Sequence, residues 1–146
     1  MEDKQLIRKV EEAARAHKDG SPDVFLYSLF DFAFDYDAEN EEVRMQIPIN
    51  ELMYNPVGFI HGGVMLYIAD TAMGHLCAAF NEAPSVSLEL NSQFLRTAKK
   101  GTLHARASFL KKGRSVQYAE CDIKDEEGKL LTKITGTFYT LPDAQG

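Results

Sequence analysis

The sequence predicts an α+β fold in which one long apolar helix lies on one face of an antiparallel sheet of five to six strands. Residues 64–80 are apolar almost throughout, and their apolar side chains recur at helical spacing. Two runs before this stretch and four runs after it alternate apolar and polar residues, which is typical of half-buried strands. This order of elements indicates an antiparallel sheet packed against the long helix.

The length and composition fit one soluble domain. The chain has 146 residues, 45% hydrophobic and 26% charged, which is enough to bury a core. Its first residues are charged with no apolar signal segment after them, and the long apolar stretch is interrupted by Asp70 and His75. We therefore expect a cytoplasmic protein without membrane contact. Cys77 and Cys121 lack metal-ligand spacing, so we expect reduced core thiols and no metal site.

The charge is unevenly distributed along the chain. The formal net charge is −6, yet residues 90–119 contain seven Lys or Arg and no Asp or Glu. This basic segment on an acidic protein suggests an anionic ligand that is bound at one place. The overall acidity argues against nucleic acid, which usually selects a basic domain. Two ordinary lysine-bearing turns are the simpler explanation for any one of these residues, but less so for the whole set.

The segment before the long helix predicts one helix and one hairpin. Residues 3–18 form an amphipathic helix that the Gly20–Asp23 turn ends, and we expect it to cover the sheet or a neighbouring subunit. Residues 1–24 are thus an N-terminal helix and linker, and 25–146 the main domain. The aromatic stretch 25–30 is a further helical turn or a lid. Strands over 29–37 and 42–49 make the hairpin.

Four further strands are expected after the helix, over residues 85–95, 102–111, 115–124 and 130–141. In the first, strict alternation places Val86, Leu88, Leu90 and Phe94 on one face. Ser87 then falls on the opposite face, with Glu89, Asn91 and Gln93.

The long helix is preceded by Asn55-Pro-Val-Gly-Phe-Ile-His-Gly-Gly63, a stretch crowded with turn residues. The first N–H groups of a helix have no partner within it, and the helix dipole makes this end positive. Such a start can hold an anion or a developing oxyanion. A tight loop that needs glycine only for its backbone angles explains the same residues, and on this observation alone it is favoured.

Asp70 is the unusual residue of the long helix. It falls on an apolar flank beside Leu66, Met73 and Cys77. A buried carboxylate is costly unless it is paired, and apolar surroundings raise its pKa, which suits a base that works near neutrality. The alternative is a structural acid that points into solvent or bonds a neighbouring loop, and the helix pattern does not separate the two.

The spacing of these features suggests a dimer. Gly62 and Asp70 are eight residues apart, so along one helix they lie roughly 12 Å from each other. They cannot act on one small reacting group from the same chain. Two such helices packed antiparallel about a two-fold axis would bring Asp70 of one chain toward Gly62 of the other, and Gly74 leaves room for this approach.

Taken together, Asn55, His61-Gly62-Gly63 and Asp70 have the spacing of a known motif. The chain resembles the hotdog-fold acyl-CoA thioesterases of the phenylacetate-degradation type, from about Leu29 to Leu141. The resemblance implies a hotdog fold, hydrolysis of an acyl-CoA thioester to free acid and CoA, and a homodimer or dimer of dimers. CoA would be part of the substrate, and no separate cofactor is implied.

The resemblance also implies roles for individual residues. Asp70 would be the nucleophile or the general base, and the Gly62 N–H would bind the thioester oxygen in a site shared between chains. Asn55 would polarise the water or carbonyl, and His61 would orient the site or merely stabilise the turn. Ser87 would help to hold the water. The residues expected to contact substrate or CoA are Gly63, Arg96, Lys112 and Arg114.

Two other functions fit the same fold. A non-catalytic acyl-CoA or lipid binder would need no acid at the scissile bond, and a dehydratase would need a His and acid arrangement that the chain does not show. The acyl group itself is not specified: Phe25, Tyr27, Phe30, Met65, Met73 and Phe80 suit an aryl pocket, a medium-chain pocket or the core.

Overall fold

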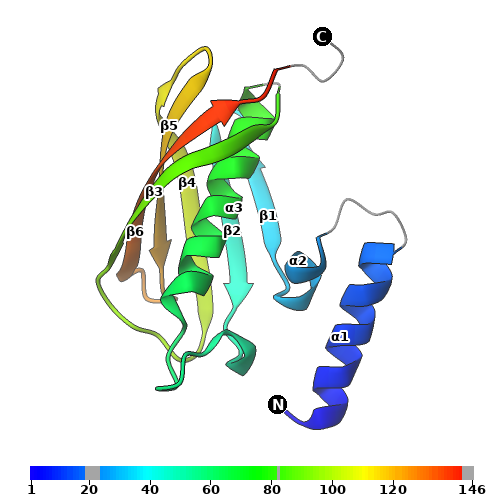
Figure 1. Ribbon diagram of the computed structural model, residues 1–146. Helices are drawn as coiled ribbons and strands as arrows, with labels where there is room; N and C mark the ends of the chain where they lie inside the picture. The colour runs from blue at the N-terminus through cyan, green and yellow to red at the C-terminus, as the bar shows by residue number, and fades with distance from the viewer. Residues whose placement is uncertain (19–23, 82, 143–146) are drawn as a thin grey trace.

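The computed structural model describes residues 1–18, 24–81 and 83–142, and shows one long helix lying across a six-stranded antiparallel sheet (Figure 1). The strand order is β1-β2-β4-β5-β6-β3. The strands are β1 (Ala33–Asp37), β2 (Glu42–Pro48), β3 (Ser85–Phe94), β4 (Thr102–Lys112), β5 (Val116–Lys124) and β6 (Leu130–Thr140). The helices are α1 (Asp3–Lys18), α2 (Phe25–Leu29) and α3 (Gly62–Phe80), with a 3-10 turn over Glu51–Met53. The predicted α+β class and strand number are confirmed.

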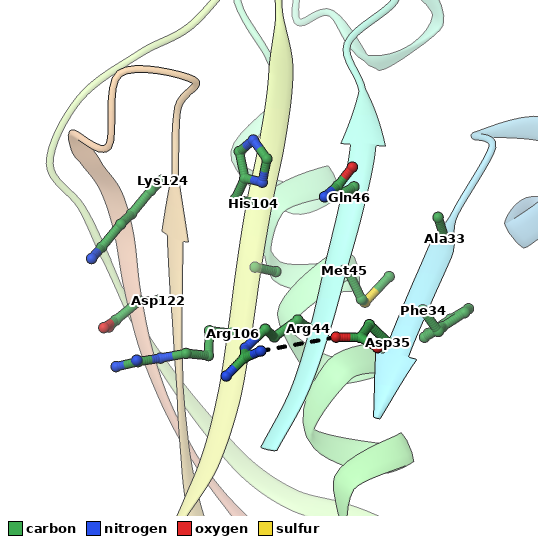
Figure 2. Close-up of a pocket in the computed structure, with 11 residues that line it drawn as sticks. Ala33, Phe34, Asp35, Arg44, Met45, Gln46, His104, Arg106, Asp122 and Lys124 are labelled. Atoms are coloured by element: carbon green, nitrogen blue, oxygen red, sulfur yellow. Dashed lines mark ion pairs between the residues drawn. The ribbon is translucent and has the colours of Figure 1, made fainter. Parts of the chain in front are cut away.

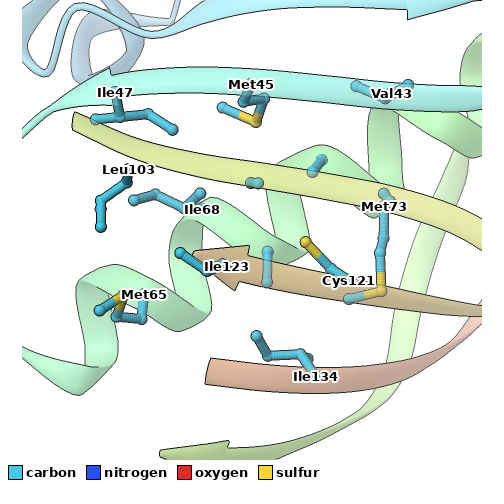
Figure 3. Close-up of a cluster of buried hydrophobic side chains, with 14 of the residues drawn as sticks. Val43, Met45, Ile47, Met65, Ile68, Met73, Leu103, Cys121, Ile123 and Ile134 are labelled. Carbon is cyan, nitrogen blue, oxygen red and sulfur yellow. The ribbon is translucent and has the colours of Figure 1, made fainter. Parts of the chain in front are cut away.

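The core lies between α3 and the inner face of the sheet. Alternate residues of β2 are buried, and Figure 3 shows Val43, Met45 and Ile47 on the side of the sheet that faces α3. By length and composition α3 would pass for a membrane span, yet Ile68 and Leu76 are fully buried against the sheet. Burying each such side chain stabilises the fold by about 1.5–3 kcal/mol, so packing on the sheet explains the apolar sequence of α3.

The N-terminal helix forms where predicted but does not cover the sheet. α1 packs on α2, beyond the β1 edge (Figure 1). Lys9 forms an ion pair of 2.5 Å with Asp31, and the N-terminal amino group pairs with Glu51. The turn predicted over residues 20–23, Glu82 and the tail from residue 143 lie outside the described residues.

The first predicted strand begins too early. The chain is helical over Phe25–Leu29, and β1 begins only at Ala33. Asp31 has a φ of +54°, so the chain turns sharply there before the strand starts. The rings of Phe30 and Phe32 belong to an aromatic cluster at this turn. Their spacing in the sequence therefore reflects packing at the turn and not a strand. The stretch 25–30 is thus the further helical turn that was one of its two interpretations.

Candidate active site

The loop before α3 is organised by Asn55. Its side-chain oxygen accepts hydrogen bonds from the N–H groups of Val57, at 3.0 Å, and Phe59, at 3.1 Å. Its own N–H donates to the Phe59 carbonyl at 2.7 Å. The side-chain oxygen of Asn55 therefore holds the turn, and its side-chain NH₂ is the group left to contact a substrate.

His61 caps the start of α3. Its Nδ1 accepts the Gly63 N–H at 2.8 Å, so a neutral ring carries its proton on Nε2. The Gly62 N–H has no acceptor among the described residues. A Cβ at Gly62 would lie 3.2 Å from the Phe94 ring, so a side chain there would press on this ring. The helix start thus presents the Gly62 N–H and the His61 Nε2–H as donors.

Asp70 lies in a groove between α3 and β3. The groove has a volume of about 480 Å³, and Ser87 and Gly74 also line it. Burial raises the pKa of the Asp70 carboxyl, and a hydrogen bond from Ser87 partly offsets this. No cation among the described residues contributes to the shift. An acid with a raised pKa in a groove is a candidate for proton transfer near neutral pH.

Ser87 reaches Asp70 because β3 contains a bulge. The register of β3 against β6 shifts between Ser87 and Glu89, so that Ser87 pairs with Phe138 and Leu90 with Gly136. Phe138 is buried on the inner face, and Ser87 consequently shares that face. Strict alternation from the sequence had placed Ser87 opposite Leu90, and this part of the prediction is wrong. The extra residue at the bulge is the physical reason.

Tyr27 and His75 also line the Asp70 groove. His75 Nδ1 lies 2.8 Å from the Tyr36 hydroxyl, and its Nε2 lies 3.3 Å from the Tyr27 hydroxyl. Its ring stacks on Phe34 with centroids 4.4 Å apart. Burial lowers the pKa of the His75 imidazole. The sequence analysis noted His75 only as an interruption of the apolar stretch. A histidine within an otherwise apolar helix is itself a signal, because a buried imidazole needs polar partners.

In one chain the two groups of site residues remain apart. Asn55, His61 and Gly62 belong to the start of α3, and none of them lines the Asp70 groove. Eight residues of helix separate Gly62 from Asp70, a distance of roughly 12 Å. One protomer therefore offers a carboxylate in one place and N–H donors in another.

Comparison with known proteins identifies the family. Residues 57–132 match the Thioesterase superfamily. A Pasteurella multocida protein that is named as an esterase is 30% identical over 108 residues, which cover 70% of this chain and 78% of that protein. A 1,4-dihydroxy-2-naphthoyl-CoA hydrolase of Listeria monocytogenes is 32% identical over 96 residues, 64% of this chain and 78% of that enzyme. This chain belongs to the thioesterase superfamily.

A solved structure has the same fold as this chain over nearly the whole length of both. A Bacillus halodurans protein, solved with CoA, has a TM-score of 0.84 and covers 96% of this chain and 93% of that chain. The two sequences are 23% identical, so this likeness concerns the fold. The predicted family and fold are confirmed.

The basic residues do not form one patch on this thioesterase-superfamily chain. The loop that holds Arg96 runs beside the start of α3, because the Ala98 carbonyl accepts the Ile60 N–H at 3.0 Å. Lys112 lies at the opposite end of β4 and pairs with Glu41 at 2.9 Å. Arg114 follows in the same hairpin. Within one chain β4 holds the two groups apart, so they would meet one anion only between copies of the chain, and the single basic place stays a prediction.

A larger hollow lies on the outer face of the sheet, away from α3 (Figure 2). Its volume is about 580 Å³. Arg44 lies 3.9 Å from Asp35 there, the ion pair drawn in Figure 2, and Arg106 lies 3.2 Å from Glu42. These charges are paired with one another, and the sheet separates them from Asp70. We give this hollow no part in the chemistry. Among residues 1–18, 24–81 and 83–142, no group of three or more His, Cys, Asp or Glu is placed to hold a metal.

Proposed function

We propose that this protein hydrolyses an acyl-CoA thioester to the free acid and CoA. The observation that carries the proposal is the position of Asp70, a half-buried carboxyl that lines the groove between α3 and β3 together with Ser87. Burial raises its pKa, which suits a base near neutrality. Membership of the thioesterase superfamily makes thioester hydrolysis the general activity. The Listeria monocytogenes relative is named for a CoA thioester, which favours CoA as the carrier.

The proposed active site is composite and forms between two copies of the chain. β3 is an edge strand of the sheet, and Val86 and Leu88 on it are 45% and 61% exposed. The α3 face around Asp70 is uncovered, and Gly74 has open space where a side chain would be. An edge strand beside an uncovered helix face is a natural surface for a second copy. With the helices antiparallel, Asp70 of one chain would approach Gly62 of the other.

In the proposed reaction the thioester carbonyl lies between these two groups. The Gly62 N–H of the partner subunit donates to the carbonyl oxygen and stabilises the negative charge that develops there. In one route the Asp70 carboxylate takes a proton from a water that attacks the carbonyl carbon. In the other route the carboxylate attacks the carbon itself, and the mixed anhydride that forms is then hydrolysed by a water. In both routes collapse of the tetrahedral intermediate breaks the carbon–sulfur bond. CoA leaves as the thiolate and takes up the proton that the water gives, and the oxygen of that water becomes part of the acid product.

The supporting groups follow from the same geometry. Ser87 holds the carboxylate or the water through its hydroxyl. His61 of the partner subunit offers its Nε2–H, and Asn55 of the partner subunit offers its side-chain NH₂, both beside the helix start of that subunit. Arg96 lies in the loop beside this helix start, where a phosphate would meet a charge-assisted hydrogen bond. Lys112 and Arg114 lie at the far end of β4, so they would contact CoA only from another copy of the chain.

The test is thiol release from a panel of acyl-CoAs that includes short-chain, long-chain and phenylacetyl groups. The wild type should turn over at least one of them, and Asp70→Asn should lower kcat by about 10²–10⁴-fold. Equal turnover by the variant would remove Asp70 from the mechanism. Tight binding of CoA esters without any product would instead identify a non-catalytic acyl-CoA binder.

A further inference from the structure

The hollow on the outer face of the sheet contains two rows of polar side chains (Figure 2). In the first row, Arg44 of β2 pairs directly with Arg106 of β4. In the second row, His104 pairs with Gln46 on one side and with Lys124 of β5 on the other. The rows are two residues apart along β4, which is roughly 6.6 Å at the backbone. The register of three strands thus gathers the basic side chains of both rows in one hollow.

The two arginines are unusual neighbours, because like charges directly opposite each other on antiparallel strands destabilise a sheet. Glu42 bridges them, with 3.3 Å to Arg44 Nη2 and 3.2 Å to Arg106 Nε. Asp37 also pairs with Arg44 Nη2, at 3.1 Å, while Asp35 lies 3.9 Å from Nη1, beyond hydrogen-bonding distance. Neither Glu42 nor Asp37 lines the hollow. A guanidinium has five N–H donors, so these contacts leave part of each arginine available on the side of the hollow.

The second row adds cationic donors that the protein does not pair. Within residues 1–18, 24–81 and 83–142, neither Lys124 nor His104 has an ion-pair partner. The two acids that line the hollow, Asp35 and Asp122, belong to β1 and β5, the strands at its two ends. Lys133 already holds Asp122 at 2.8 Å. The acids therefore lie at the rim, and the available donors lie between them.

We propose that this hollow binds a diphosphate group, with one phosphate at the arginine row and the other at the row of His104 and Lys124. The volume of about 580 Å³ is that of a small-molecule site. Arginine and lysine bind phosphate oxygens through charge-assisted hydrogen bonds. One carboxylate would engage a single row, whereas a diphosphate has oxygens for both. Free pyrophosphate, nucleoside diphosphates and CoA all contain this group.

This site is separate from the proposed active site. The sheet lies between the hollow and Asp70, and Arg96, Lys112 and Arg114 do not line it. The inference therefore does not depend on the proposed function, and either can fail without the other.

The test is calorimetric titration with inorganic pyrophosphate at low salt, where exposed charges are screened least. The wild type should bind pyrophosphate, and Arg106→Gln and Lys124→Gln, one from each row, should each raise Kd about three- to tenfold. Lys129→Gln is the matched control, because it removes the same charge from the turn after β5, where Lys129 pairs with Glu127. Its Kd should equal that of the wild type. Tm and thiol release, measured on the same preparations, should be unchanged in all three variants.

Competition identifies the source of the diphosphate. Displacement of bound pyrophosphate by ADP supports nucleoside diphosphates, and displacement by CoA alone supports the substrate. No binding of pyrophosphate by the wild type would overturn the site. An equal loss in Lys129→Gln would reduce it to unspecific attraction by surface charge. Binding that survives both row variants and is lost in Arg96→Gln would move the anion to the loop beside the start of α3, and would also reject the hollow.

Discussion

The Ser87 hydroxyl shares the groove between β3 and α3 with the Asp70 carboxyl. It does so because the β3 bulge turns Ser87 to the inner face of the sheet. Burial raises the pKa of Asp70, and the Ser87 hydroxyl, as a hydrogen-bond donor to the carboxylate, lowers it again in part. The bulge therefore helps to set the pH at which the carboxylate forms.

We predict that Ser87→Ala moves the acid limb of the kcat/KM profile to higher pH. Removing a hydrogen bond to the ionised carboxylate leaves burial less opposed, so the pKa of Asp70 rises further. Activity that needs the carboxylate is then lost at a higher pH as the solution is acidified. The measurement is kcat/KM across the acid range. Ser92→Ala is the control, because Ser92 lies on the same face of β3 and does not line the groove. An acid limb that stays in place, or moves down, contradicts the assignment of Asp70.

The fold was predictable because its signals are local and periodic. Residues of β2 alternate along the whole strand, those of β4 alternate as far as Ala107, and α3 has apolar residues at helical spacing over its whole length. The motif residues at the start of α3 were also predictable, because turn residues and spacing identify them without knowledge of the packing.

The remaining features depend on tertiary contacts that leave no such signal. The β3 bulge is set by pairing with β6, so alternation alone places Ser87 on the wrong face. Arg96 and Lys112 are close in sequence, but they lie at opposite ends of a long strand. His75 finds its partners in Tyr27 and Tyr36, which are 48 and 39 residues away. Sequence spacing carries no information about such pairs.

Asp70→Asn should raise the thermal stability of the protein at neutral and alkaline pH. A carboxyl whose pKa is raised in the folded state costs stability above that pKa, where the folded protein must hold the charge. Below the ordinary carboxyl pKa of about 4, both states are protonated and the cost disappears. The Tm of the variant should therefore exceed that of the wild type by a few degrees near pH 8. The difference should shrink as the pH falls toward about 4.

Calorimetry at equal protein concentration checks this, because oligomerisation also shifts Tm. Glu89→Gln, at an exposed position on β3, is the control for removing an acid from the same surface. A variant that is less stable than the wild type at every pH would show that the Asp70 carboxylate has a structural role.

Substitutions of His61 should separate its capping role from a catalytic one. His61→Ala leaves the Gly63 N–H without its acceptor and should cost about 1 kcal/mol of stability. Asn is a good helix cap, so His61→Asn should recover most of this loss. If the Nε2–H orients the reacting group, kcat stays low in both variants while the stability returns in one. Chemical denaturation and thiol release, measured on the same preparations, provide both values. Full recovery of kcat in His61→Asn would reduce His61 to a cap.

Gly74→Gln should abolish the dimer and the activity together. In a single chain a side chain at Gly74 meets nothing within 4 Å, and Gln is a far better helix former than Gly. If this face is free in solution, the variant should be more stable by up to about 1 kcal/mol and unchanged in size. If α3 of a second copy packs here, the added side chain separates the helices. Each carboxylate then loses the partner's N–H donor. Light scattering with size-exclusion chromatography, together with thiol release, distinguishes these outcomes, and an active variant of unchanged mass would disprove a composite site at this face.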